Sequence, residues 1–224
     1  FLIGATSGRT TLAGEGLQHQ DGSSHLIAST VPTCRAYDPC YAYELAVILA
    51  SGMQAMLHTQ QDLFYYLTVA NENYSHPPMP PGAEEGIIRG MYRIRRGPAP
   101  ASTDAGHAPR RVTLLGAGAI LREVIAAAEL LETEFDIVAD VYSVTSFTEL
   151  RRDGLGVERW NRLHPAAEPR VSWIESCLGT AAGPVIAASD YVRAVADLIR
   201  PWIPGRYVAL GTDGFGRSDT RVAL

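Results

Sequence analysis

The chain contains no lysine, and all 19 of its Lys and Arg positions are arginine. Without lysine, it can form no Schiff base with a carbonyl substrate or with pyridoxal phosphate, and it cannot supply the lysine of a phosphate-binding P-loop. Runs of like charge are also missing, and the net charge is only -5. We therefore expect neither nucleic acid nor a membrane surface as a partner.

Cysteine is scarce as well. The chain has three cysteines, Cys34, Cys40 and Cys177, an odd number without a Cys-x-x-Cys pair. This pattern argues against both a secreted disulfide framework and a zinc site, so we predict no metal ligands here and a reducing, cytoplasmic location.

Long apolar runs are absent too. The most apolar stretch, residues 41–57, is interrupted by Glu44 and Gly52 and is typical of a buried helix rather than a membrane span. The first four residues include neither Met nor a basic leader, so we expect a segment of a longer chain and no signal peptide.

Apolar segments with strand and helix character alternate along the chain, which predicts an α/β fold with a mostly parallel sheet. Strands are predicted at 63–69, 112–115, 137–144, 185–188 and 207–210. Helices are predicted after Asp38 as N-cap, over 120–131, over part of 148–161, and from Ser189 as N-cap to residue 199.

Residues 75–109 are rich in Pro, Gly, Ala and Ser and indicate a domain boundary. We predict one domain at 1–76, an interdomain linker at 77–110 and a second domain at 111–224. Within the linker, the Arg-rich stretch 89–96 could form a strand or a helix end.

Two glycine-rich segments invite functional interpretations. Gly116 and Gly118 follow a predicted strand, but Leu121 stands where a dinucleotide-binding fingerprint needs its third glycine, so a tight strand-to-helix turn is favoured. The loop 213–219 is interpreted in the same way, as a structured turn.

The richest polar cluster is the segment GEGLQHQDGSSH at residues 14–25. It places Glu15, His19, Asp21 and His25 in a loop, and histidine exchanges protons near neutral pH, so acid–base catalysis is one hypothesis and a solvated surface loop is the other. A zinc site is less well supported, because the two histidines are six residues apart without a third clustered ligand.

This loop and its lead-in, TSGRTTL at 6–12, resemble homodimeric pyruvate dehydrogenase decarboxylating components. Further matching motifs follow in order: YDPCYAYE at 37–44, NENY at 71–74, GAEEGI at 82–87, DVYSVTSFTEL at 140–150, ERWN at 158–161 and GTDGFGRSD at 211–219. The resemblance covers essentially the whole chain.

The resemblance implies a transketolase-like, thiamine diphosphate-dependent enzyme. The chain would hold the end of the pyrimidine-binding domain and a truncated transketolase carboxy-terminal-like domain. Thiamine diphosphate and Mg²⁺ would be bound mainly by sequence upstream of Phe1, so the cofactor-binding residues stay unknown and we expect this segment alone to be inactive.

By motif position, Glu15, His19 and His25 resemble active-site residues of the family. The resemblance implies pyruvate as substrate, the lipoyl domain of the acetyltransferase component as partner, and a homodimer. Ser23 departs from the pattern, because the family carries His there. Two alternatives stay open: a thiamine-dependent transketolase-like enzyme with another substrate, and a non-catalytic dimerisation module.

Overall fold

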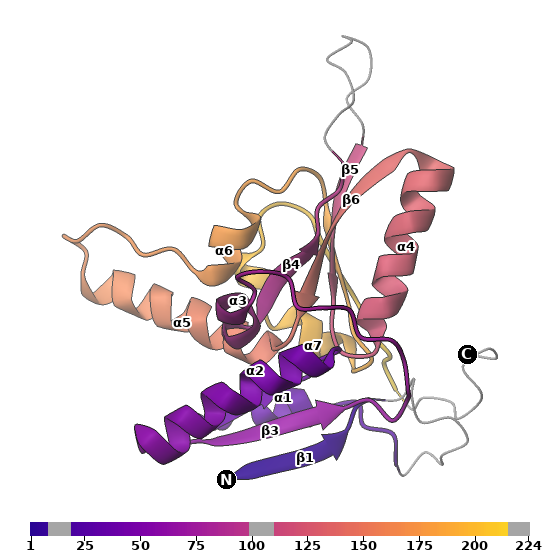
Figure 1. The fold of residues 1–224 in the computed structure, drawn as a ribbon. Coiled ribbons are helices and arrows are strands. Elements are labelled where there is room, and N and C mark those ends of the chain that lie inside the picture. Colours follow the sequence, from indigo (N-terminus) through magenta and orange to yellow (C-terminus); the bar gives the residue numbers. More distant parts are fainter. Residues whose placement is uncertain (9–18, 99–109, 215–224) are drawn as a thin grey trace.

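The chain forms two sheets, as seen in a computed structural model that describes residues 1–8, 19–98 and 110–214 (Figure 1). The first sheet is parallel, with the order β1-β3-β2; the second has the order β4-β6-β5-β7-β8, with β4 antiparallel to β6 and the other pairs parallel. The strands are β1 (Leu2–Thr6), β2 (Cys34–Tyr37), β3 (Phe64–Val69), β4 (Met91–Arg95), β5 (Arg110–Gly116), β6 (Ile137–Val144), β7 (Val185–Ala188) and β8 (Tyr207–Leu210).

Helices pack on both faces of the second sheet, as expected for a mainly parallel sheet. One face packs against α4 through Leu121, Val124 and Ala128; the other packs against α5, α6 and α7. The helices are α1 (Ser24–Ala28), α2 (Ala42–Met53), α3 (Glu84–Arg89), α4 (Ile120–Phe135), α5 (Phe147–Leu163), α6 (Trp173–Leu178) and α7 (Arg193–Asp197), with the π-helix η2 (Gln54–His58) and the 3-10 helix η3 (Arg200–Trp202). None of those described is long and apolar enough to cross a bilayer.

The predicted strands from residue 63 onward and the predicted helix after residue 120 are confirmed. The helix predicted in part over 148–161 is α5, continuous from Phe147, with Ser146 accepting a hydrogen bond from the Glu149 backbone at 3.0 Å.

Both predicted capping residues are wrong. Helix α2 begins at Ala42 rather than after Asp38, because Glu44 accepts from the backbone N–H of Tyr41 at 2.9 Å and stabilises that start. Helix α7 begins at Arg193, with Val192 rather than Ser189 as N-cap, and ends at Asp197. Residues 189–192 instead turn away from the end of β7.

The predicted linker contains regular structure. Helix α3 lies in it, and β4 is an edge strand of the second sheet, paired with β6. Gly90, with φ 106°, ends α3 and lets the chain turn directly into β4. The described residues 77–98 thus include a helix and an edge strand of the second sheet. The position of the domain boundary stays a prediction.

The two sheets meet at the carboxyl ends of their parallel strands. The Asp38 backbone N–H, just after β2, donates to the Thr145 carbonyl after β6 at 2.8 Å. The Gly118 N–H, after β5, donates to the Asp38 carbonyl at 3.2 Å. These contacts bring segments more than 75 residues apart into one polar junction.

Glu44 connects the same elements from within. Its carboxylate is fully buried and accepts four hydrogen bonds: from the backbone N–H of Cys40 (2.6 Å) and Tyr41 (2.9 Å), and from the hydroxyls of Tyr92 (2.7 Å) and Ser143 (2.6 Å). Burial raises the pKa of Glu44, and the four donors oppose that shift. One side chain therefore ties α2 to β4 and β6.

We expect Glu44→Ala to lower the free energy of unfolding by more than about 3 kcal/mol, because several buried donors would each lose a partner worth about 1–3 kcal/mol. Chemical denaturation followed by circular dichroism measures the loss. Glu134→Ala, an exposed position on α4, is the matched control and should stay within about 0.5 kcal/mol of the parent. A loss as small as the control's would contradict this account.

Candidate functional site

Asp38 lies at the centre of the junction between the sheets. Its Oδ1 accepts hydrogen bonds from Ser7 Oγ at 2.8 Å and Thr68 Oγ1 at 2.6 Å, and from the Tyr191 hydroxyl at 3.4 Å. Ser7 directly follows β1, Thr68 lies near the end of β3 and Tyr191 follows β7. The carboxyl ends of parallel strands are where α/β proteins commonly place functional groups.

His25, carried by α1, joins this network through Thr68. Its Nε2 lies 3.0 Å from Thr68 Oγ1. The single hydroxyl proton of Thr68 is directed to Asp38 at 2.6 Å rather than to the more distant Tyr37 carbonyl at 3.4 Å. We infer that His25 carries its proton on Nε2 and donates it to Thr68, so that a chain of hydrogen bonds runs from His25 to Asp38.

The surroundings of His25 keep its ring neutral. The ring is buried and packs edge-on against Tyr191 with a centroid distance of 4.7 Å, and against Tyr66 at 5.5 Å. Burial lowers the pKa of His25 to about 4, although the charge of Asp21 opposes the shift. Near neutral pH, His25 is therefore a neutral hydrogen-bond donor rather than a proton exchanger.

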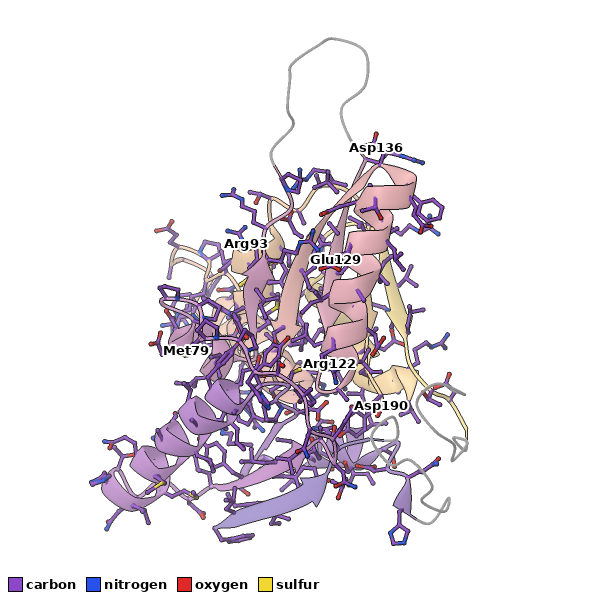
Figure 2. All side chains as sticks on the ribbon, turned by 45° about the vertical axis from the view of Figure 1, so that its right-hand side comes forward. Met79, Arg93, Arg122, Glu129, Asp136 and Asp190 are labelled. Atoms are coloured by element: carbon purple, nitrogen blue, oxygen red, sulfur yellow. The ribbon has the colours of Figure 1, made fainter. Side chains whose placement is uncertain are left out.

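The pKa of Asp38 is shifted in the opposite direction. Burial raises its pKa to about 7, and the nearby charge of Asp190 adds to this, whereas the hydroxyl donors oppose it. Asp190 lies at the end of the second sheet nearest the first (Figure 2). Asp38 Oδ2 has no hydrogen-bond partner within the described ranges. A protonated Asp38 beside a neutral His25 is thus the favoured state in mildly acidic solution.

Gly118 lies tightly against this carboxyl group. A Cβ atom at this position would lie 2.2 Å from Asp38 Oδ2, and the residue has φ 49°. The Gly-x-Gly turn is therefore required for close packing onto Asp38. An acidic group occupies the place that an anionic phosphate would need, which supports the structural interpretation of the turn.

The network encloses almost no free space. A small cavity of about 10 Å³ is lined by His25, Asp38, Phe147 and Tyr191. That is near the lower limit for one water molecule. Among the described residues, this space is too small for an organic substrate.

The described part of the predicted loop, residues 19–23, contains His19 and leads into α1; His25, predicted to lie in the loop, lies in that helix instead. Asp21 Oδ1 accepts from the backbone N–H groups of Ser23 at 3.0 Å and Ser24 at 2.9 Å and so stabilises the start of α1. The Gly22 carbonyl accepts from Val192 N–H at 2.8 Å. The backbone N–H of Ser23, the residue that departs from the family pattern, is thus one of the two donors to Asp21 in this turn.

The three predicted catalytic residues have different positions. Glu15 lies outside the described residues. His19 is exposed, and it precedes the turn formed by Asp21. His25 is buried, and its ring nitrogen Nε2 contacts Thr68 in the network.

Sequence reasoning missed Ser7, Thr68 and Tyr191 as network members and misassigned Asp38. Asp38 was interpreted as preceding a helix, whereas in the structure it directly follows strand β2.

Comparisons with known proteins identify relatives for the whole chain. A family model for the pyruvate dehydrogenase E1 component middle domain matches residues 1–77, and one for the transketolase-like TK C-terminal domain matches residues 90–224. The pyruvate dehydrogenase E1 component of Pseudomonas aeruginosa is 61% identical over 225 residues, covering 100% of this chain and 25% of the relative. That of Escherichia coli K12 is 52% identical over 226 residues, covering 100% and 24%. The chain thus spans about a quarter of their length.

Solved structures confirm the predicted fold class. Transketolase from Leishmania mexicana matches with a TM-score of 0.64 at 17% identity, covering 98% of this chain and 27% of that one. Transketolase from Campylobacter jejuni matches with a TM-score of 0.65 at 14% identity, covering 99% and 28%. At such identity, these matches concern the fold.

The opposite pKa shifts of His25 and Asp38 predict a specific pH dependence of stability. Between pH 4 and 6.5 the unfolded chain holds the extra proton on His25, so this residue makes stability rise with pH. Between pH 3.8 and about 7 the folded chain holds the extra proton on Asp38, so this residue makes stability fall as pH rises. Each slope is at most about 1.4 kcal/mol per pH unit, and the two nearly cancel up to pH 6.5.

We therefore expect Asp38→Asn to show stability that rises from pH 4 to 6.5, and His25→Gln to show stability that falls over the same range. Denaturant unfolding at several pH values measures both slopes relative to the parent. His58→Gln, an exposed histidine, is the control and should keep the parent's profile. If both network variants had the control's slope, the proposed protonation states would be incorrect.

Proposed function

The chain belongs to the pyruvate dehydrogenase E1 component family of transketolase-like proteins, and we propose that the protein containing it oxidatively decarboxylates pyruvate. The reaction would use thiamine diphosphate and would reductively acetylate a lipoyl group. The observation that carries the proposal is the high identity to pyruvate dehydrogenase E1 components along the entire chain. The proposed partners are the lipoyl domain of the acetyltransferase component and a second copy of the protein, and the proposed location is the cytoplasm.

Thiamine diphosphate, when bound, supplies the carbanion that attacks the pyruvate carbonyl and the electron sink for decarboxylation. Within the described ranges no group of three or more His, Cys, Asp or Glu side chains is arranged to hold a metal ion. We propose, from the family resemblance, that the cofactor and Mg²⁺ are bound mainly by parts of the protein outside this chain, and no cofactor-binding residue is assigned within it.

We assign the proton-handling roles to the loop at the sheet junction. Glu15 and His19 are the proposed acid–base groups, and His19 is the exposed histidine of the pair His19 and His25. His25 is proposed to position the loop, because its hydrogen bond to Thr68 and its packing against Tyr191 hold α1 in place. This division of roles follows from burial, which favours a neutral His25 and leaves His19 accessible.

Assays of the whole protein distinguish the proposed function from two alternatives. Pyruvate turnover that requires thiamine diphosphate supports the proposal, whereas a preference for longer 2-oxo acids or for ketose phosphates supports another thiamine-dependent enzyme. Loss of all turnover with retained dimer formation supports a dimerisation module.

We expect His19→Ala in the whole protein to slow reductive acetylation of the lipoyl domain about 100-fold, since a positioned general acid or base contributes about 10²–10⁴-fold. The affinity for thiamine diphosphate should change by a smaller factor than the rate of acetyl transfer. Stopped-flow acetylation of the lipoyl domain and calorimetric titration of the cofactor measure the two effects. His58→Ala, at another exposed histidine, should leave both unchanged, and parent-like acetylation by His19→Ala would refute the assigned role.

A further inference from the structure

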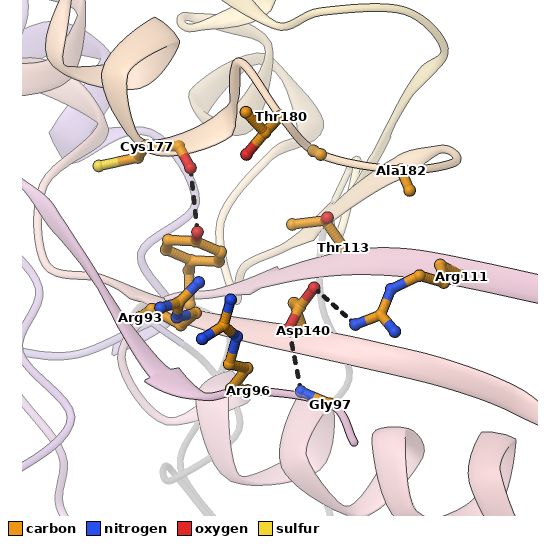
Figure 3. A pocket seen from close by; sticks show the side chains of 11 residues that line it. Arg93, Arg96, Gly97, Arg111, Thr113, Asp140, Cys177, Thr180 and Ala182 are labelled. Atoms are coloured by element: carbon orange, nitrogen blue, oxygen red, sulfur yellow. Dashed lines mark hydrogen bonds and ion pairs between the residues drawn. The ribbon is translucent and has the colours of Figure 1, made fainter. Parts of the chain in front are cut away.

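A second polar site lies on the second sheet, away from the junction. It is a pocket of about 400 Å³, a volume within the range of small-molecule sites (Figure 3). Arg93 on β4, Arg96 just after it and Arg111 on β5 line it, and Thr180 in the segment after α6 covers the opposite side. Asp140, also in the lining, belongs to the first half of β6, whereas the junction with Asp38 lies beyond the other end of that strand.

The charges of this pocket are only partly balanced. Arg111 lies 3.2 Å from Asp140 and also donates to the Pro98 carbonyl at 3.1 Å. The second oxygen of Asp140 accepts the backbone N–H of Gly97 at 2.9 Å. Asp140 is the acidic residue of the lining, and each of its two carboxylate oxygens therefore already has a partner.

Arg93 and Arg96 are the remaining cations of the lining. In the described part of the chain neither forms an ion pair with a carboxylate. Burial raises the pKa of Tyr142, and the charge of nearby Arg93 opposes that shift. The Tyr142 hydroxyl donates to the Cys177 carbonyl at 3.0 Å. Figure 3 shows both guanidinium groups projecting from the β4 edge into the pocket.

We infer that this pocket binds a small dianion, carrying either a phosphate group or two carboxylates. Two guanidinium groups that line one pocket and have no acidic partner among the described residues repel each other, and a dianion between them would remove that repulsion. The planar, forked guanidinium matches phosphate and carboxylate oxygens in two-point contacts. The hydroxyls of Thr113 and Thr180 add neutral hydrogen-bonding groups on the facing walls.

The size and walls of the pocket restrict the ligand further. Its volume admits a metabolite but not a folded partner, and its lining combines the arginines with the Tyr142 ring and the small residues Ala181 and Ala182. A short carbon skeleton beside the anionic groups would fit these walls. The inference is independent of the reaction proposed above, because the pocket shares no residue with the Asp38 network.

Calorimetric titration of the whole protein tests the site, with inorganic phosphate, glycerol phosphate and malonate as probes. Thiamine diphosphate and Mg²⁺ are kept saturating so that the cofactor site cannot take up the probes, and ionic strength is held constant with chloride. We expect at least one probe to bind, and R93Q/R96Q to bind it about tenfold or more weakly. Preference for phosphate, for its ester or for malonate identifies the anionic group.

The control variant R159Q/R162Q removes the same charge from exposed positions of α5 and should bind the probe as the parent does. Equal weakening in both variants would indicate only a general charge effect and would overturn the proposal, as would failure of all three probes to bind. If R93Q/R96Q does not fold, Arg93→Gln and Arg96→Gln are measured singly, and parent-like affinity in both overturns it.

Discussion

The arrangement of the two sheets depends on burying the Asp38 carboxyl group. Removing a carboxyl group from water is costly unless hydrogen-bond donors surround it. Ser7, Thr68 and Tyr191 supply those donors, and each comes from the carboxyl end of a different strand. The strand ends of both sheets must therefore converge on one point, and Gly118 lets the turn after β5 approach without a clash.

The same network explains why the loop before α1 is suited to function although its supporting residues are sealed from solvent. His25 is held neutral and buried, and Asp21 and Val192 fix the turn that precedes it. A turn fixed by its own hydrogen bonds can hold neighbouring side chains in defined positions at little entropic cost. The polar site at the opposite end of β6 differs from this network. There, arginine side chains line a pocket, whereas the network buries a carboxyl group among hydroxyl groups.

Much of the fold was predictable because strong local signals coincide with tertiary structure. The β-branched run at β6 and the helical spacing in α4 both describe segments whose burial pattern follows from their own residues. The helix starts were less predictable. Asp38 and Ser189 both have the chemistry of N-caps, but in the folded chain Glu44 stabilises the start of α2 and Val192 precedes α7. Strand β4 was ambiguous because its sheet partner, β6, lies some 45 residues further along.

The sequence by itself determined the α/β class, the family resemblance and the polar character of residues 14–25, because these depend on local composition and on the order of motifs. Only the tertiary structure separated an exposed His19 from a buried His25, and only it brought Arg93, Arg96 and Arg111 around one pocket. Burial and charge pairing arise between residues that are distant in the chain. The pKa of a histidine, or the partner of an arginine, is therefore decided by how the sheets pack.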